Sequence, residues 1–531
     1  MTVQEFTPSM QTGVPLVPDL PPEQPFISRR MHWMNMLDLH NTDRPDEEVI
    51  VSEKGERITW GMLCERVQAM AADLEKRGVV AGDRVLILAL NRAEYIAALV
   101  AINTIGAIAA PLNSRSVPVE LKYFIEDSGA KAIYVDDLGA SVAAGIEGGP
   151  GIDVIHFDHD VPGIVAAGGT PTFVDVPEQA IAMIVYTSGT TSAPKGVMLS
   201  YLNLVSQMIP IFRSAQPPGE VPETNLTVVP LFHIAGLGFL TPAFFGGTRI
   251  VLAPPSVMQN IGALADLVEK EQVTSMFLVP TIWQALCSIP GIKERNLPLK
   301  TLSWGASPAS KETLQLMRDT FPDAQISAAF GQTEMSPVTA NLPDHDSIRK
   351  MGSIGKPISA VAWRVVDPAG EDVADDVMGE AVYRGPGLMA GYWNKPQQTQ
   401  ESTYDGWFHS GDLVKRDSEG YMFVVDRAKD LIISGGENIS SVEVEQAVAA
   451  HPKVADASVI GAPDPKWVET PVAIVVPTDP ADPPTLDEVH DFLKDRLAGF
   501  KKPTRLEVVD VLPRNASGKL LKHKLRDEFA K

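Results

Sequence analysis

The chain has 531 residues, of which 44% are hydrophobic and 21% are charged, and its formal net charge is −22. Such a length exceeds what one hydrophobic core usually supports, so we expect two or more domains in an ordinary globular protein. The negative charge argues against nucleic acid as a partner, although local loops can still bind an anionic nucleotide. Two cysteines, Cys64 and Cys287, are too few for a disulfide framework and predict reduced thiols in a cytoplasmic protein.

The first 30 residues are rich in Pro and Thr and lack an apolar core flanked by basic residues. They predict a loosely held arm rather than a signal peptide. The most apolar predicted helical stretch, 96–102, ends at Asn103 and is far shorter than the roughly 18 apolar residues of a membrane span. We therefore expect no transmembrane segment.

Helices and strands alternate from residue 31 onward. A helix at 31–40 and another at 59–78 come first, and the continuous apolar run 84–90 predicts a strand buried on both faces. A helix at 93–104 and a strand at 107–111 complete a β-α-β unit.

The alternation is interrupted at 139–169, where Gly and Asp predict a surface excursion, and it resumes after residue 200. This repetition predicts a large α/β body with parallel sheets. From about Trp363, short strands between Gly and Pro turns predict a β-rich subdomain, and the end of the chain predicts a small α+β unit. In the second half of the body, strands are expected at 226–229, 249–252, 275–279 and 301–304, and helices at 261–271, 281–288 and 308–320.

A run of Thr, Ser and Gly, from Thr187 to Ser192, follows the predicted strand 181–186 and precedes Lys195. Hydroxyls and backbone N–H groups in such a turn can surround phosphate oxygens, and a lysine adds a positive charge. The run is not a Walker A loop, because Gly196 stands where that motif needs Ser or Thr. On composition alone, a flexible surface turn is an equal alternative.

Six further motifs follow, and each alone is a weak signal. They are Pro230-Leu-Phe-His233, Gly305-Ala-Ser-Pro308, Phe330-Gly-Gln-Thr-Glu334, Ser410-Gly-Asp412, Asp426-Arg-Ala-Lys-Asp430 with Ile433-Ser-Gly-Gly436, and Pro513-Arg-Asn-Ala-Ser-Gly-Lys519. Together with the loop at 187–195, and in this order, they resemble the adenylate-forming superfamily of acyl-CoA synthetases, luciferases and peptide-synthetase adenylation domains. The resemblance covers nearly the whole chain after residue 40. The chain departs from the family at Ser192 and Trp304, where the family usually has Gly, and at Ser441, where it often has Pro.

The resemblance implies an adenylation domain at 31–428, built of parallel-sheet α/β subdomains plus a β-rich subdomain, and a small mobile α+β C-terminal domain at 429–531. It also implies a carboxylate–CoA ligase that uses ATP, Mg²⁺ and coenzyme A. A carboxylate oxygen would attack the α-phosphorus of ATP to give an acyl-adenylate and pyrophosphate, and CoA would then displace AMP. Because carboxylate and ATP are both anions, cations and hydrogen-bond donors must neutralise the phosphates and align the reactants.

The resemblance also implies roles for single residues. The expected catalytic residues are Thr187, Lys195, Glu334 and Lys519, with Glu334 holding Mg²⁺ and Lys519 bridging the carboxylate and the α-phosphate. Asp412 would contact the ribose, Arg427 the ribose or a phosphate, and Thr333 the α-phosphate. Phe330 and the backbone of the turn at Gly305 would lie along adenine. The full set expected to bind ATP or AMP is Thr187, Ser188, Gly189, Thr190, Thr191, Lys195, Gly305, Ala306, Ser307, Ala329, Phe330, Gly331, Thr333, Asp412, Arg427 and Lys519. Lys429 is the expected hinge, and Ser434, Gly435 and Gly436 would face the pantetheine arm of CoA.

The carboxylate itself is less well defined. No acidic residue lies near His233, which disfavours an amino acid because a buried ammonium needs a counter-charge. We expect a medium-to-long-chain fatty acid; an aryl acid of the benzoate or cinnamate type, transfer of the acyl group to a carrier protein, and a protein without ligase activity are alternatives. An inward-pointing Trp304 would shorten the pocket, and a homodimer is an alternative to a monomer. The expected acyl pocket consists of Phe232, His233, Leu237, Phe239, Trp283, Trp304, Ala328, Ala329 and Phe330.

Overall fold

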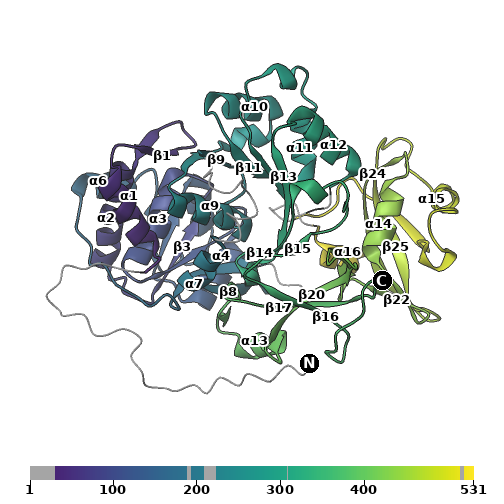
Figure 1. Cartoon of the computed structure of the whole chain (residues 1–531). Helices are drawn as coiled ribbons and strands as arrows, with labels where there is room; N and C mark the ends of the chain where they lie inside the picture. The colour runs from purple at the N-terminus through teal and green to yellow at the C-terminus, as the bar shows by residue number, and fades with distance from the viewer. Residues whose placement is uncertain are drawn as a thin grey trace, which may run out of the picture.

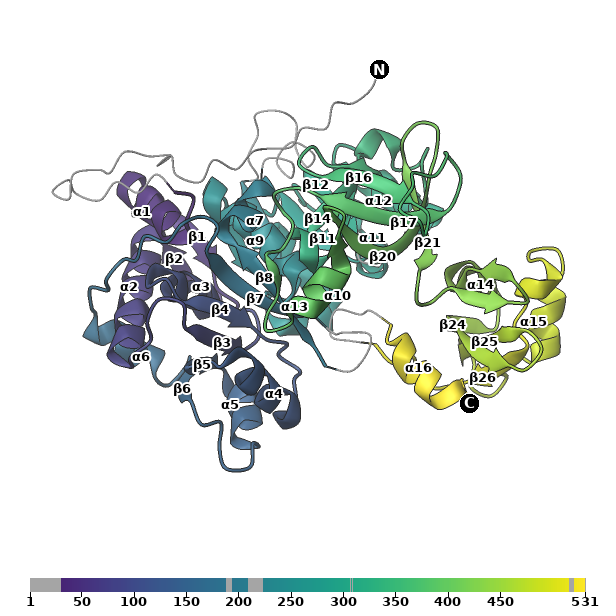
Figure 2. The same ribbon diagram turned by 90° about the horizontal axis from the view of Figure 1, so that it is seen from below.

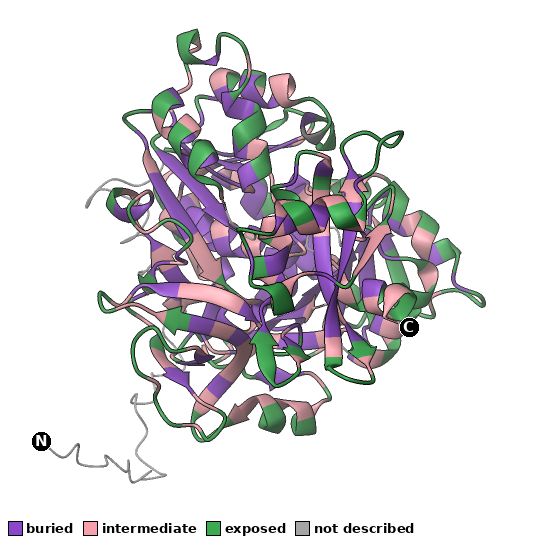
Figure 3. Ribbon diagram, turned by 90° about the vertical axis from the view of Figure 1, so that its right-hand side faces the viewer, coloured by how far each residue is buried: buried purple, intermediate pink, exposed green. Residues whose placement is uncertain are grey.

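The computed structural model describes residues 30–187, 193–208, 223–305, 307, 309–514 and 520–530 (Figure 1). Within these residues the strands form four sheets, three in the body of the chain and one in its C-terminal part. The parallel α/β sheets, the β-rich sheet and the C-terminal α+β unit confirm the expected fold class. Figure 3 shows that buried residues are concentrated on the strands, whereas the surface helices are largely exposed.

The first sheet contains the strands on both sides of the predicted phosphate loop. Its order is β18-β8-β7-β4-β3-β5-β6. Neighbouring strands from β7 through to β6 in this order are parallel, and β8 is antiparallel to β7. The strands are β3 (Arg84–Leu88), β4 (Ile108–Pro111), β5 (Ala132–Val135), β6 (Asp153–His156), β7 (Ile181–Thr187), β8 (Lys195–Ser200) and β18 (Gly391–Tyr392). The helices of this half are α1 (Trp33–Asp43), α2 (Trp60–Lys76), α3 (Ala93–Thr104), α4 (Pro118–Ser128), α5 (Asp137–Ala144), α6 (Val161–Ala167) and α7 (Tyr201–Ser206).

The expectation of a surface excursion at 139–169 is wrong in part, because most of α5 and all of β6 and α6 fall within it. β6 extends the first sheet by pairing in parallel with β5.

The central sheet has the order β15-β14-β13-β12-β11-β9-β10-β1-β2, and its strands from β13 to β1 pair in parallel. The strands are β1 (Glu48–Val51), β2 (Arg57–Thr59), β9 (Thr224–Thr227), β10 (Arg249–Leu252), β11 (Ser275–Leu278), β12 (Thr301–Gly305), β13 (Gln325–Gly331), β14 (Val338–Leu342) and β15 (Lys356–Pro357). The helices that follow them are α9 (Ile234–Gly246), α10 (Ile261–Lys270), α11 (Pro280–Cys287) and α12 (Lys311–Thr320). The expected strands and helices of this region are thus confirmed to within three residues.

The two faces of the central sheet differ in chemistry, because alternate residues of a strand point to opposite sides. One face, called here the outer face, packs against α10, α11 and α12, which lie beside β11 and β13 in Figure 1. Its residues in β9, β11, β12 and β13 are Leu226, Met276, Leu278, Leu302, Trp304, Ile326 and Ala328. The opposite face, called here the inner face, contains Asn225, Thr227, Ser275, Phe277, Thr301, Ser303, Gly305, Ser327, Ala329 and Gly331.

An antiparallel sheet follows, as the change to short strands predicts. It comprises β16 (Ala362–Val366), β17 (Gly379–Arg384), β19 (Thr403–Tyr404), β20 (Trp407–Arg416) and β21 (Met422–Arg427), with α13 (Pro396–Ser402) inserted before β19.

The last sheet is formed by β22 (Ile432–Ser434), β23 (Glu437–Ile439), β24 (Val454–Asp464), β25 (Val468–Pro477) and β26 (Arg505–Val508). With α14 (Ser441–Ala449) and α15 (Leu486–Phe492) it encloses a small core of its own. The last helix, α16 (Lys522–Phe529), packs on β24. Figure 2 shows this unit beside the body, reached through β21.

The chain leaves one sheet at Arg427 and enters the next at Ile432, so the segment between them joins the two units. The buried carboxylate of Asp426 accepts hydrogen bonds from the backbone N–H of Ser441 (2.5 Å) and from its hydroxyl (2.8 Å). A proline at position 441, which the family often has, could not donate the first of these bonds. The division at residue 428 stays a prediction.

Both cysteines are buried and unpaired, and burial raises the pKa of each thiol to about 11. They are therefore protonated and unreactive at neutral pH. Among the described helices, none combines the length and the apolar character that crossing a bilayer requires.

Candidate active site

Several predicted nucleotide-binding residues lie where strands end. Thr187 ends β7, Gly305 ends β12 and Gly331 ends β13. In α/β sheets, ligands bind outside the carboxyl ends of parallel strands, so these positions mark one side of a common site. Ser188, Gly189, Thr190, Thr191, Ala306 and Lys519 lie outside the described residues, and their roles stay predictions.

The predicted phosphate-binding cation and hydroxyl lie opposite each other. β7 and β8 form an antiparallel pair in which Thr187 is in register with Lys195. The Thr187 hydroxyl donates to the carbonyl oxygen of Lys195 at 3.4 Å, and both residues are partly exposed. The structure therefore brings an ammonium and a hydroxyl together at the mouth of this hairpin.

A tyrosine that the sequence did not single out connects Lys195 with Glu334. The Tyr392 hydroxyl donates to Glu334 Oε1 at 3.0 Å, and Lys195 Nζ lies 4.8 Å from the centroid of the Tyr392 ring. Burial, together with the Glu334 carboxylate, raises the pKa of Tyr392 well above its usual value, so the hydroxyl remains a donor. Lys195, Tyr392 and Glu334 thus form one cluster, called here the phosphate cluster.

The phosphate cluster is fixed by backbone pairing. β18 pairs with β8, which places Tyr392 opposite Val197, two residues from Lys195. The Met389 N–H donates to the carbonyl oxygen of Glu334 at 2.8 Å, so the segment before β18 is attached to the short helical turn Thr333–Met335. Thr333, the predicted α-phosphate contact, is buried at the start of that turn.

The predicted ribose contacts also lie together. Asp412 and Arg427 are in register on β20 and β21, and Asp412 Oδ1 is 3.0 Å from Arg427 Nε. Gln332, in the turn before Glu334, lies 3.5 Å from Asp412 Oδ2. The Asp412 carboxylate is almost fully buried, and the adjacent guanidinium keeps this buried charge paired. These contacts link the Ser410-Gly-Asp412 motif to the Phe330-Gly-Gln-Thr-Glu334 motif.

The predicted adenine wall has little room for side chains. A Cβ atom at Gly305 would collide with the carbonyl oxygen of Ala329 and lie 3.2 Å from the Phe277 ring. A Cβ atom at Gly331 would collide with the carbonyl oxygen of Pro337. Only glycine therefore fits these two strand ends without a shift of the backbone. Phe330 is partly exposed beside them, and Ser307 is exposed.

A small hollow lies between α9 and the inner face of the central sheet. It is lined by Asn225, Leu226, Thr227, Val228, Val229, Gly236, Phe239 and Phe277. The Phe239 ring of α9 and the Phe277 ring of β11 both line it and are 4.9 Å apart at an angle of 37°. His233 caps α9, because its Nδ1 accepts from the Ala235 N–H at 3.2 Å. Of the expected acyl-pocket residues, Phe239 is the one that lines this hollow.

The structure contradicts three members of the expected acyl pocket. Trp304 pairs with Leu278 and Ala328 on the outer face, so its side chain and that of Ala328 lie on the other side of the sheet from Phe277. Trp283 is fully buried in the same outer core, where its Nε1 donates to the Ser303 carbonyl oxygen at 3.0 Å. The expectation that Trp304 shortens the acyl pocket is therefore wrong. Strand alternation explains the result, since a residue next to Ser303 must face the opposite way.

Leu237 also lies outside the hollow. It is fully buried in the main core together with Leu231, Ile234 and Leu240, whereas Gly236 and Phe239 line the hollow. Phe232 and His233 are partly exposed just before α9.

The expected hinge lies between the two units. Lys429 is exposed, and its carbonyl oxygen accepts from Arg526 Nη2 of α16 at 3.4 Å. Arg526 also pairs with Asp430 at 2.5 Å. The predicted CoA loop follows: Gly435 and Gly436 have φ of 60° and 90°, and the Gly435 N–H donates to the Trp467 carbonyl oxygen at 2.7 Å.

Known proteins resemble this arrangement over nearly its whole length. Residues 37–393 match the AMP-binding enzyme family, and residues 443–519 match the AMP-binding enzyme C-terminal domain. The chain belongs to the AMP-binding enzyme family. It is 36% identical to a feruloyl-CoA synthase from an Amycolatopsis species over 481 residues, which cover 90% of this chain and 95% of that protein. It is 34% identical to a 2-succinylbenzoate–CoA ligase from Bacillus velezensis over 510 residues, covering 94% and 98%.

A solved relative has the same fold. The o-succinylbenzoate CoA synthetase from Bacillus subtilis, in complex with its acyl-adenylate intermediate, superposes with a TM-score of 0.82 at 30% identity, covering 93% of this chain and 98% of that one. The same enzyme has been solved with ATP and a magnesium ion. These findings confirm the expected superfamily and that the chain is an enzyme.

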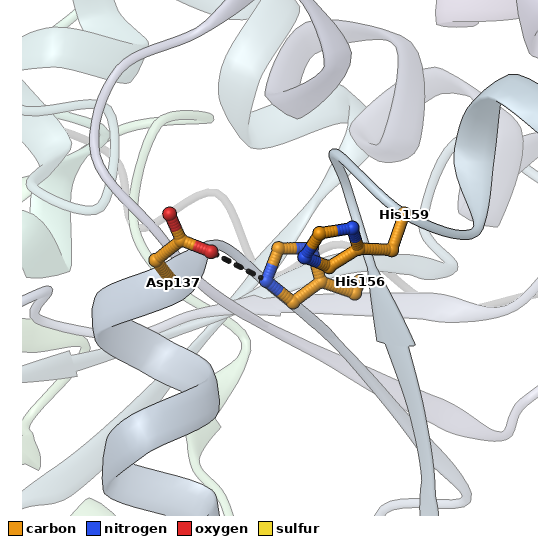
Figure 4. A group of neighbouring side chains, drawn as sticks. All are labelled: Asp137, His156 and His159. Atoms are coloured by element: carbon orange, nitrogen blue, oxygen red, sulfur yellow. Dashed lines mark ion pairs between the residues drawn. The ribbon is translucent and has the colours of Figure 1, made fainter.

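This AMP-binding enzyme also has a group of metal-ligating residue types outside the site. Figure 4 shows Asp137, at the start of α5, beside His156, which ends β6, and His159, which lies in the turn that follows; His156 Nε2 is 3.1 Å from Asp137 Oδ1. However, the Asp158 N–H donates to His156 Nδ1 at 3.1 Å. Since Nδ1 accepts this hydrogen bond, the ring N–H is on Nε2, which donates to Asp137 rather than offering a lone pair to a metal ion. The geometry is that of a hydrogen bond at the surface.

Proposed function

We propose that this protein is an AMP-forming carboxylate–CoA ligase whose carboxylate is an aryl acid. The ligase class rests mainly on the phosphate cluster, in which Lys195, Tyr392 and Glu334 are in contact beside the Asp412–Arg427 pair. The aryl substrate is supported by the aromatic pair Phe239 and Phe277 at the hollow, and by the names of two relatives, which denote CoA esters of ring-containing acids. The fatty acid that we expected first becomes the alternative.

In the first half-reaction, a carboxylate oxygen bonds to the α-phosphorus of ATP, and the bond from that phosphorus to pyrophosphate breaks. Lys195 and the Thr187 hydroxyl contact phosphate oxygens and offset their charge. Asp412 accepts hydrogen bonds from the ribose hydroxyls, and the Arg427 guanidinium pairs with its carboxylate. Lys519 approaches the α-phosphate and stabilises the charge that develops there.

The oxygen donors at this site suit Mg²⁺. Glu334 presents a carboxylate held by the Tyr392 hydroxyl, and hard oxygen ligands together with phosphate oxygens are what this ion prefers. When bound, Mg²⁺ supplies neutralisation of the phosphate charge.

In the second half-reaction, the CoA thiolate attacks the acyl carbon and AMP leaves. The C-terminal unit turns about Lys429 and presents Ser434, Gly435 and Gly436 to the pantetheine arm. The expected cytoplasmic location and the homodimer stay predictions.

The test is pyrophosphate release from ATP with purified full-length protein, across benzoates, cinnamates and fatty acids of several lengths, with and without CoA. We expect release with an aryl acid and, when CoA is present, equal amounts of AMP and of the aryl-CoA thioester. Preference for a fatty acid would overturn the aryl assignment while keeping the ligase. Release of pyrophosphate without consumption of CoA would favour transfer to a carrier protein.

A further inference from the structure

The inner face of the central sheet is polar where a buried parallel sheet is normally apolar. Its polar residues are Asn225, Thr227, Ser275, Thr301, Ser303 and Ser327, and each is at most 7% exposed. The register joins them across adjacent strands: Asn225 pairs with Ser275, Ser275 with Thr301, and Ser303 with Ser327. Burying polar groups costs free energy unless they find hydrogen-bond partners, so a polar face of this extent calls for an explanation.

The hollow lies against one end of this polar face. Asn225 and Thr227 line it from β9, Phe277 lines it from the neighbouring strand β11, and Phe239 lines it from α9. The hollow is lined by the last three residues of β9, Asn225 to Thr227, and by the two residues that follow, Val228 and Val229. The chemistry takes place at the carboxyl ends of the parallel strands, near Val229, so Asn225 lies at the far end of the hollow.

Asn225 keeps hydrogen-bonding capacity at that far end. Its Nδ2 donates to the Ser275 hydroxyl at 3.1 Å, and its Oδ1 accepts from the Thr227 hydroxyl at 3.3 Å. An asparagine amide has two N–H donors and two acceptor lone pairs. The side-chain bonds within the described residues therefore use one donor and one lone pair, and they fix the orientation of the amide.

We infer that Asn225, oriented by Thr227 and Ser275, is a specificity-determining residue that binds a polar substituent on the distal end of the acyl group. This inference rests on the proposed function and narrows its substrate class to aryl acids with a hydroxyl or ether group on the ring, on the side away from the carboxylate. An alkyl chain or an unsubstituted ring would cover Asn225 without a partner for the second N–H and the second lone pair of its amide. Sites built to hydrogen-bond a substrate hydroxyl reject analogues that lack it, because the buried protein group is left unpaired.

The experiment compares two acids that differ only in one group, 4-hydroxycinnamate and cinnamate, by kcat/KM for CoA-thioester formation. We expect the native enzyme to prefer the hydroxylated acid by about tenfold, the effect of one net hydrogen bond. In Asn225→Leu, which keeps the volume and removes the amide, the preference should fall to about one through slower turnover of the hydroxylated acid alone. Thr227→Val removes a hydroxyl at constant shape and should lower the preference by a smaller factor.

Ser303→Ala is the matched control, because Ser303 is a buried polar residue of the same face that does not line the hollow. It should leave the preference unchanged. A native enzyme that prefers cinnamate, or an Asn225→Leu variant that keeps the native ratio, would overturn the inference, and Thr227→Val decides the point if Asn225→Leu does not fold. If no acid of the wider panel releases pyrophosphate, the proposed function itself fails, which is a separate result.

Discussion

The two faces of the central sheet are built from the same strands and differ in nearly every respect. The outer face presents large apolar side chains, such as Leu278, Leu302 and Trp304, to the helices α10, α11 and α12. The inner face presents glycine, serine, threonine and asparagine toward the hollow and the predicted nucleotide site. Neighbouring residues of a strand point to opposite faces of the sheet. A residue that packs in the core can therefore directly follow a residue that borders the proposed site.

This separation explains why neighbouring substitutions should have different effects. A side chain removed from the outer face leaves a cavity between the sheet and its helices, whereas a change on the inner face alters the surroundings of the substrate. We therefore expect outer-face substitutions to lower the free energy of unfolding at unchanged specificity. Substitutions of inner-face residues that line the hollow or end at the predicted nucleotide site should change catalysis or specificity more than stability.

The largest expected effect is on the outer face. Trp304→Gly restores the residue that the family usually has, yet here it removes a buried indole from the core around Trp283 and Met317. Removal of a buried tryptophan side chain costs about 3–5 kcal/mol. The Nε1 of Trp304 has no hydrogen-bond partner among the described residues, and an unpaired buried N–H lowers stability. We therefore expect a loss near the lower end of this range. Urea unfolding measures the loss, and Leu302→Ala on the same face should behave alike. A changed preference among acids with no loss of stability would show that Trp304 does face the substrate.

At the carboxyl ends of the strands, the expected effect is on catalysis. Glu334→Gln removes a negative charge from the phosphate cluster and keeps the shape of the side chain. We expect adenylation to slow by about a hundredfold, as when one preorganised electrostatic contact to the reacting groups is lost. Pyrophosphate release at several Mg²⁺ concentrations measures it, and the free energy of unfolding should change by less than about 1 kcal/mol. Full activity at ordinary Mg²⁺ concentration would remove Glu334 from the proposed metal site.

Gly305→Ala tests the inner face where it meets the predicted nucleotide site. The new methyl group would approach the Ala329 carbonyl oxygen and the Phe277 ring. Insertion of a methyl group into a packed region costs about 1–3 kcal/mol, and the displaced Phe277 ring should also narrow the hollow. We expect Gly305→Ala to raise the KM for bulky aryl acids more than the KM for small ones. Gly352→Ala is a comparison at a glycine with open space around its Cβ position, where a φ of 85° still strains any other residue. It should change stability without changing the KM values.

Much of this architecture follows from the sequence, and the exceptions have physical reasons. The strands around Met276 and Leu302 are predictable because apolar residues recur at short spacing between turn signals. The face of the sheet on which Trp304 lies is not predictable in this way. Alternation shows that Trp304 and Ser303 point to opposite faces, but it does not show which face the helices cover. β6 is not predicted, because Asp153 and Val154 are exposed at the sheet edge, so the strand lacks a continuous apolar run.

The site shows the same limit. Motif order identifies Lys195, Glu334, Asp412 and Arg427. In the structure, Lys195 and Glu334 both contact Tyr392, and Asp412 pairs with Arg427. Tyr392 belongs to neither a motif nor a periodic pattern. Its contact with Glu334 spans 58 residues and depends on the pairing of β18 with β8, which no local signal indicates.

Tyr392→Phe should have the smallest effect and gives the sharpest test of the phosphate cluster. It removes one hydroxyl, keeps the ring beneath the Lys195 ammonium, and leaves Glu334 without its 3.0 Å donor. The loss of one hydrogen bond predicts about a tenfold decrease in adenylation rate, with a raised requirement for Mg²⁺ because the carboxylate is less well oriented. Tyr392→Leu also removes the ring contact with Lys195 and should weaken ATP binding as well. If the phenylalanine variant needs no more Mg²⁺ than the native enzyme, Tyr392 stabilises the strand pairing alone and does not position Glu334.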